Sequence, residues 1–244
     1  MLSLSRRDFL TLIAGSAAAA TGPTIPHIKA VVFDALAIFD PRPVFALADR
    51  MFPGAGLSDE WRTRQFEYCW LRVCSGRYAD FWQVTRDSLS FATKKLRLDV
   101  SIADRTRLLN AYLALNAWPD VVPALESMKK AGLRLALLSN FSPAMLDANV
   151  WSAGLAAMFD ARVSTDWSKT YKPDPRAYQL GVTSLNLKRE NILFVAFAGW
   201  DAAGAKQFGY PTYWVNRQQL PPEEMGVLPD ASGETLRDLT TFLV

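Results

Sequence analysis

The sequence predicts an α/β fold, a doubly wound parallel sheet with an inserted helical cap domain. Short runs of consecutive apolar residues, of which Ala30–Phe33 is the first, are typical of strands buried on both faces of a parallel sheet. In the second half of the chain such runs alternate with helix-length segments, which indicates βα units. Residues 44–117 show apolar residues only at helical spacing, so we expect them to form the cap.

The first strand runs directly into Asp34. A carboxylate at the end of a buried parallel strand projects into the crevice where open α/β sheets bind ligands. Asp40-Pro41-Arg42-Pro43 follows as a turn, because its prolines do not fit a continuing central strand. In the cap, three- and four-residue spacing predicts helices over Trp61–Ser75, Tyr78–Leu96 and Ala103–Leu115.

Regular alternation resumes at Pro119, so we expect the sheet domain to comprise residues 27–43 and 118–244. Ser142 and Pro143 predict a helix start, with serine at the cap and proline in the first turn. The tail from Gly233 is expected to be helical. The remaining predicted elements are the strands Leu133–Leu138, Ala161–Ser164, Ile192–Ala196 and Thr212–Val215 and the helices Val121–Lys130 and Pro175–Leu185.

The composition of the chain argues against several classes of function. The 244 residues are 50% hydrophobic and 21% charged with a net charge of +3, and no dense basic run indicates a nucleic-acid partner. His27 is the only histidine, which excludes histidine-based triads and multi-histidine metal sites. Cys69 and Cys74 lie five residues apart in a helical segment, so two buried thiols are expected rather than a disulfide. Neither a metal nor a cofactor is expected.

The first 26 residues are expected to lie outside the fold. Ser5-Arg6-Arg7 is followed by a modestly apolar run to Ala20, which resembles a twin-arginine export signal. The run is too short, and too rich in alanine and glycine, for a stable membrane span. We therefore expect a periplasmic protein whose mature chain begins between Ala20 and Pro26. The alternative is an amphipathic leader that stays attached.

Polar residues follow the ends of successive predicted strands. They are Asp34, Ser139, Asn140, Lys172 and Asp201. Because the carboxyl ends of parallel strands meet at one edge of a sheet, these side chains are expected to face one crevice although they are far apart in sequence. A single polar residue at a strand end carries little information, but a set of them predicts a site.

These positions lie in stretches with a family resemblance: FDALAIFD, LALLSNFSP, YKPDPRAY and ILFVAFAGWDAAGAKQFGYPT, with WRTRQFEYCWLRVCSGRYADF in the cap. From Ile28 to the C-terminus the chain resembles the haloacid dehalogenase superfamily, and more narrowly the bacterial type II (S)-2-haloacid dehalogenases. The resemblance implies hydrolysis of short (S)-2-haloalkanoic acids to (R)-2-hydroxy acids without a cofactor. It implies a small-molecule 2-haloacid as the partner and leaves a homodimer open.

The resemblance also implies roles for three residues in the reaction. Asp34 would be the nucleophile and form an aspartyl ester, which splits one difficult displacement into two easier steps. Lys172 would lie near Asp34 and keep it ionised through its opposite charge. Asp201 would position or deprotonate the water that hydrolyses the ester.

The remaining implied roles concern binding. Arg62, with Asn140 and Trp200 beside it, would hold the leaving halide, where negative charge develops in the transition state. Ser139 and the backbone N–H groups after Asp34 would hold the substrate carboxylate. Those groups belong to Ala35 and Leu36, and Tyr178 would support Lys172. Taken singly, Arg62 could be a solvated surface arginine, and the aromatic residues could be core.

Three departures from the family pattern bear on activity. Ile38 stands where the family usually has threonine, and Ala196 and Ala198 stand where it usually has serine and asparagine. Those groups help to orient the nucleophile, the lysine and the hydrolytic water, and the loss of such supporting hydrogen bonds commonly costs tenfold or more. One alternative is therefore an exported binding protein that keeps the fold without turnover.

A phosphatase of the same superfamily is the other alternative. Such enzymes typically carry a second acid two residues after the nucleophile and paired acids for magnesium. Here the first position is Leu36, and Asp201 has no adjacent acid. An octahedral oxygen site for magnesium would therefore be short of ligands.

Overall fold

The computed structural model describes residues 27–243. Within them one parallel sheet has the strand order β3-β2-β1-β4-β5-β6, so the predicted doubly wound fold is confirmed. Its strands are β1 (Ala30–Phe33), β2 (Arg134–Ser139), β3 (Ala161–Ser164), β4 (Ile192–Ala196), β5 (Thr212–Val215) and β6 (Ala231–Gly233). The α-helices are α2 (Ala35–Ile38), α3 (Arg42–Met51), α4 (Leu57–Cys74), α5 (Phe81–Lys95), α6 (Ile102–Asn110), α7 (Val121–Lys130), α8 (Pro143–Ser152), α9 (Pro175–Leu185), α10 (Gly199–Phe208) and α11 (Leu236–Leu243). Three short 3₁₀ helices are η1 (Ala111–Leu113), η2 (Thr165–Ser168) and η3 (Arg189–Asn191).

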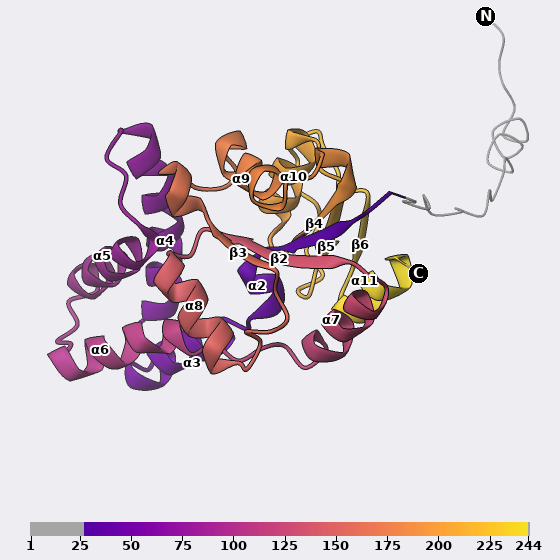
Figure 1. Cartoon of the computed structure of the whole chain (residues 1–244). Helices are drawn as coiled ribbons and strands as arrows, with labels where there is room; N and C mark the ends of the chain where they lie inside the picture. The colour runs from indigo at the N-terminus through magenta and orange to yellow at the C-terminus, as the bar shows by residue number, and fades with distance from the viewer. Residues whose placement is uncertain (1–26, 244) are drawn as a thin grey trace, which may run out of the picture.

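Strand β1 lies at the centre of the sheet, between β2 and β4. Val31 and Phe33 belong to the core cluster on one face, and Ala30 and Val32 to the cluster on the other. All four are fully buried, because helices cover both faces: α9 and α10 lie on one side, and α7 and α11 on the other (Figure 1). This two-sided burial explains why the strands are continuous apolar runs rather than alternating ones.

Between Arg42 and Leu113 every regular element is a helix. In Figure 1 this helical segment, α3 to α6, lies beyond the carboxyl ends of the strands. Its helix α4 packs along α5, and a buried bond of 2.7 Å from Gln65 Nε2 to Thr85 Oγ1 joins them. Tyr78 ties the segment to the sheet side of the molecule, because its hydroxyl donates to Asp166 Oδ1 at 2.9 Å.

Several elements differ from the sequence-based expectation. The predicted turn over residues 40–43 already contains the start of α3, with a proline in its first turn. The helix expected over Ala103–Leu115 ends at Asn110 and continues as 3₁₀ helix η1. The tail helix begins at Leu236 instead of Gly233, because Ala231–Gly233 pairs with β5 as a sixth strand. Helix α2 is a single turn that hydrophobic periodicity cannot reveal. Both cysteines are free thiols, but only Cys69 is buried; Cys74 is exposed at the last position of α4.

The predicted export signal lies outside the described residues. Among residues 27–243, none of the helices is long and apolar enough to cross a membrane.

Candidate active site

Asp34 follows β1 directly and is the N-cap of α2. Its Oδ1 accepts a hydrogen bond of 2.9 Å from the backbone N–H of Leu36, and its own N–H donates to Val195 O in the neighbouring strand β4 at 2.9 Å. Capping satisfies a helix N–H that would otherwise lack a partner. The carboxylate is therefore held by the local turn at one oxygen, and its other oxygen is left for a second partner.

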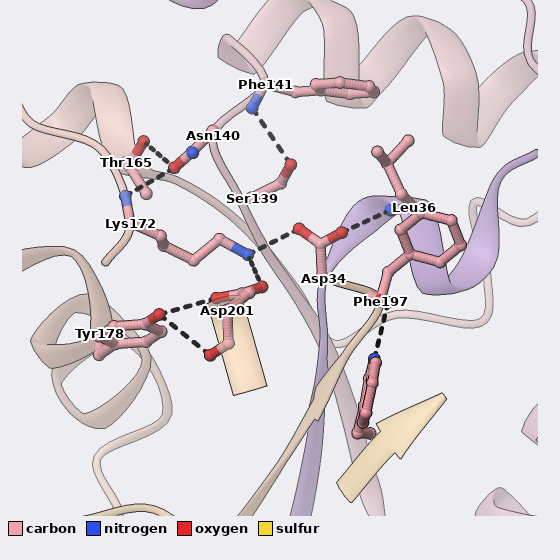
Figure 2. Close-up of polar contacts among 11 residues, drawn as sticks. Asp34, Leu36, Ser139, Asn140, Phe141, Thr165, Lys172, Tyr178, Phe197 and Asp201 are labelled. Carbon is pink, nitrogen blue, oxygen red and sulfur yellow. Dashed lines mark hydrogen bonds and ion pairs between the residues drawn. The ribbon is translucent and has the colours of Figure 1, made fainter. Parts of the chain in front are cut away.

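That second partner is Lys172. Its Nζ lies 2.6 Å from Asp34 Oδ2 and 2.6 Å from Asp201 Oδ2, and Figure 2 shows the ammonium between the two carboxylates. The lysine side chain is only 1% exposed, against 13% for Asp34 and 2% for Asp201. Burial alone would lower the pKa of Lys172, but the charges of Asp201 and Asp34 outweigh it and raise that pKa. Lys172 is therefore a fixed cation between two acids.

Asp201 lies in the first turn of α10. Besides Lys172, its carboxylate accepts a hydrogen bond of 2.7 Å from the hydroxyl of Tyr178 (Figure 2). Burial raises the pKa of Asp201 to about 6, with the Asp34 charge adding to the rise and Lys172 opposing it. Burial also raises the pKa of Tyr178 well above its ordinary value, so the phenol remains a donor. Tyr178 thus supports Asp201 directly, whereas the family resemblance implied that it supports Lys172.

Asn140 and Ser139 come from the end of β2. The Asn140 Oδ1 atom accepts hydrogen bonds from the backbone N–H of Lys172 at 2.9 Å and from the Thr165 hydroxyl at 3.2 Å. Among the described residues the Asn140 amide NH₂ has no hydrogen-bond acceptor, so it is free to donate. The Ser139 Oγ accepts the Phe141 N–H at 3.1 Å, which leaves its hydroxyl proton available for an anion.

The other two predicted binding residues lie where the cap meets the sheet domain. Trp200 is half-buried at the start of α10, and its ring lies 5.5 Å from the ring of Phe66 on α4. Arg62 lies one helical turn before Phe66 and therefore on the same side of α4. Its guanidinium lies 5.5 Å from the Phe45 ring and makes no ion pair with any residue in 27–243. The structure therefore joins Arg62 to the carboxylates by no direct contact.

Thr165 and Phe66 were missed by sequence reasoning. Thr165 directly follows β3, so the rule that singled out the other strand ends could have found it. Phe66 carries no such signal, because an apolar residue on a helix is ordinarily core. Its 49% exposure distinguishes it only in the folded protein.

The three departures from the family pattern offer no polar group to the site. Ile38 and Ala196 are fully buried, and Ala198 is the N-cap of α10 without a side-chain capping bond. The cap of α10 therefore lacks the hydrogen bond that serine or asparagine supplies at such a position.

The carboxylates are too few for a metal cage. In the part of the chain that the structure describes, His, Cys, Asp and Glu side chains form no group of three that could hold a metal ion. The side chain two residues after Asp34 is the apolar Leu36, so the second acid of the phosphatases has no counterpart there.

Comparison with known proteins gives consistent matches along the chain. A family model described as haloacid dehalogenase-like hydrolase matches residues 28–209. The chain is 44% identical over 214 residues to the (S)-2-haloacid dehalogenase of Pseudomonas sp. (strain YL), which covers 86% of this chain and 92% of that protein. It is 37% identical over 206 residues to haloacetate dehalogenase H-2 of Moraxella sp. (strain B), covering 83% and 92%.

Solved structures agree with these matches. The L-2-haloacid dehalogenase RSc1362 has a TM-score of 0.86 at 41% identity, covering 88% of this chain and 98% of that one. The L-2-haloacid dehalogenase from Xanthobacter autotrophicus with chloropropionic acid covalently bound has a TM-score of 0.81 at 35% identity, with coverage of 88% and 98%. With the family match spanning most of its length and its acid–lysine–acid arrangement at the strand ends, this chain belongs to the haloacid dehalogenase-like hydrolase family.

Proposed function

We propose that this protein hydrolyses the carbon–halogen bond of short (S)-2-haloacids and releases (R)-2-hydroxy acids. The observation that carries the proposal is the Lys172 ammonium, 2.6 Å from both Asp34 and Asp201. This arrangement places together the two acids that a two-step displacement needs, Asp34 as nucleophile and Asp201 as base. Relatives named (S)-2-haloacid dehalogenase support the choice of substrate.

In the first step a carboxylate oxygen of Asp34 attacks C2 of the substrate from the side opposite the halogen. A C–O bond forms, the C–halogen bond breaks, and the halide leaves with the bonding electron pair. The product is an ester of Asp34 with inverted configuration at C2. The Lys172 ammonium, 2.6 Å from Asp34 Oδ2, holds the carboxylate that makes this attack.

In the second step water attacks the carboxyl carbon of the ester. Asp201 takes a proton from that water as general base, the acyl C–O bond breaks, and the alkoxide leaves as the hydroxy acid after accepting a proton. Since C2 takes no part in this step, its configuration is retained from the first. The sum is one water consumed and one hydrogen halide released.

Binding groups for the two ends of the substrate surround Asp34. Arg62 with Asn140 and Trp200 would stabilise the departing halide, and the contact between Phe66 and Trp200 brings this side of α4 to the start of α10. Ser139 and the N–H group of Ala35 would hold the carboxylate of the substrate, because backbone N–H groups at the start of a turn of helix attract anions. The Leu36 N–H, which the resemblance also implied for this role, instead donates to Asp34 Oδ1 at 2.9 Å.

Halide release from the two enantiomers of 2-chloropropionate tests this function. The purified protein is expected to release chloride from the (S) form, to yield (R)-lactate, and to leave the (R) form unchanged, with the same rate in excess EDTA. No release from any short 2-haloacid by folded protein would contradict the proposal and favour a binding role. Loss of activity in EDTA with rescue by magnesium, together with phosphate-ester hydrolysis, would favour the phosphatase alternative.

The rate should also depend on pH through Asp201. Its pKa is raised to about 6 by burial, and only its ionised form can accept a proton from water. Formation of the ester removes the charge of Asp34, which is one cause of that rise. We therefore expect kcat for ester hydrolysis to be constant above neutrality and to fall only at a pH below about 6. A profile of kcat from pH 4.5 to 9 measures this, and an unchanged kcat down to pH 4.5 would contradict the role of Asp201 as base.

A homodimer is a second element of the proposal. Helix α4 exposes two large apolar side chains that are consecutive in sequence, Trp70 at 50% and Leu71 at 41%. Contiguous exposed apolar side chains commonly mark an interface, and a second copy of this chain would cover them. Sedimentation velocity is expected to give a dimer that Trp70→Glu converts to monomer; a monomeric wild-type protein at micromolar concentration would contradict it.

Export is the last element, and it rests on sequence alone. Ser5-Arg6-Arg7 and the small residues up to Ala20 are typical of a twin-arginine signal, so we propose a periplasmic location. Cell fractionation with N-terminal sequencing is expected to show cleaved protein in the periplasm. Uncleaved cytoplasmic protein, unaffected by Arg6→Lys with Arg7→Lys, would contradict it.

A further inference from the structure

Helix α2 is one turn long, so it needs partners for its backbone carbonyls from elsewhere. The Asp34 and Ala35 carbonyls accept the N–H groups of Ala37 and Phe39 within the turn. The Leu36 carbonyl accepts the indole Nε1–H of Trp118 at 3.0 Å. The two remaining carbonyls accept hydrogen bonds from residues far along the chain. The Ala37 carbonyl accepts one from the Arg217 guanidinium at 3.3 Å, and the Ile38 carbonyl accepts one from the backbone N–H of Trp118 at 3.0 Å.

Trp118 is itself held firmly. Its side chain is almost fully buried, with 7% of the residue exposed. The guanidinium groups of Arg42 and Arg217 lie over its ring at 4.4 Å and 4.5 Å from the centroid, within the range of cation–π attraction. Arg217 also forms an ion pair of 3.1 Å with Asp120. The ring of Trp118 is therefore in contact with two cations, and its N–H donates to α2.

Leu36 connects this tryptophan to the nucleophile. Its N–H donates to Asp34 Oδ1 at 2.9 Å, while its carbonyl accepts from Trp118. The backbone of one residue is thus held at both of its polar groups, and rotation of that backbone would move the N–H away from the carboxylate. The fully buried side chain of Ile38 adds only apolar contact to this turn, so the restraint depends on donors from outside α2.

We propose that Trp118 is a positioning residue of the active site: through its indole N–H it orients Leu36 and thereby the attacking carboxylate of Asp34. This rests on the proposed function, in which Asp34 is the nucleophile. Displacement requires the oxygen in line with the carbon–halogen bond, and small errors in such geometry lower the rate strongly. Halide release reports the first step alone, because the halide leaves before water attacks the carboxyl carbon of the Asp34 ester.

Trp118→Phe tests this, because phenylalanine keeps an aromatic ring beside the two arginines and removes the indole donor. Trp61→Phe is the matched control: its Nε1–H also donates to a buried backbone carbonyl, that of Thr85, at 3.0 Å, but within the cap helices. In single-turnover halide release, Trp118→Phe is expected to lower the rate constant at least tenfold with an unchanged amplitude, and Trp61→Phe to change it less than twofold. A lower amplitude at an unchanged rate constant, or equal effects of both substitutions, would overturn the proposal.

Amide hydrogen exchange separates failure of this proposal from failure of the proposed function, because it needs no turnover. In peptides covering residues 33–40, Trp118→Phe is expected to speed exchange at least tenfold, and Trp61→Phe to leave it unchanged. Unchanged exchange in Trp118→Phe would overturn the positioning role even if the wild-type protein releases halide. Suppose instead that exchange is faster in Trp118→Phe but the wild-type protein releases no halide from any 2-haloacid. The restraint of Leu36 by Trp118 would then stand, and the role of Asp34 as nucleophile would be rejected.

Discussion

Asp34→Asn is expected to reduce halide release to the background rate, the largest effect of any single substitution in this protein. Asparagine keeps the shape of the side chain and can still accept the Leu36 N–H that Asp34 Oδ1 accepts at 2.9 Å. It lacks the anionic oxygen that attacks C2, so no ester forms. Initial rates of chloride release measure this. Asp49→Asn, an exposed acid on α3, is the control and should leave the rate unchanged.

A single turnover in heavy-oxygen water distinguishes the covalent route from direct attack by water. The label is expected in Asp34 and not in the first product molecule, because water attacks the carboxyl carbon of the ester and the product keeps an oxygen of Asp34. Mass spectrometry of the peptide containing Asp34 and of the hydroxy acid gives both quantities. Label in the first product molecule would mean that water displaces the halide, and the covalent step would be wrong.

Lys172→Met has the second largest expected effect, on activity and on stability together. The substitution retains the length of the side chain but removes the charge between Asp34 and Asp201, both of which lie 2.6 Å from Nζ. Removing one partner of a buried ion pair typically costs about 3–5 kcal/mol, because it leaves uncompensated buried charge. We expect a loss of unfolding free energy of that order at pH 7 and a fall in kcat of at least about a hundredfold, as for a misplaced reacting group.

The stability loss should shrink as the pH falls. Burial already raises the pKa of Asp201, and the ammonium that opposes this rise is lost in the variant. Asp201 therefore binds a proton more readily in the folded variant than in the unfolded chain, so acid favours the folded variant relative to neutral pH. Urea unfolding at pH 7 and pH 5 measures this. The control is Lys169→Met. The Lys169 side chain is 65% exposed and pairs with Asp166, and such exposed pairs contribute about 0–1 kcal/mol. Equal losses for the two variants, or a loss independent of pH, would contradict the central role of Lys172.

Much of the sheet could be predicted from local sequence. The predicted bounds of β3, β4, β5, α7 and α9 are those of the structure, because burial on both faces imposes continuous apolar runs and helix starts carry their own cap residues. The meeting of Asp34, Lys172 and Asp201 follows from one topological rule, that parallel strands end at a common edge. For these elements local chemistry and the global fold agree.

Other features depended on partners that the sequence does not identify. Strand β6 is three residues long and exists through pairing with β5, and α2 takes its hydrogen bonds from Trp118 and Arg217, the latter 180 residues away from Ala37. Tyr178 bonds Asp201 rather than Lys172 for the same reason. Which acceptor a donor binds depends on the donor–acceptor distance and the hydrogen-bond angle, and both are defined only in the folded chain.

The sequence by itself therefore determined the class of fold, the strand that carries the nucleophile and the set of charged groups at the strand ends. Sequence patterns only a few residues long predict each of these features. Only the tertiary structure decided that Lys172 lies between two carboxylates at 2.6 Å each and that an indole holds the turn behind Asp34. Burial in that arrangement raises the pKa of Asp201 to about 6, since exclusion of water is a property of the packed molecule and not of any segment of its chain.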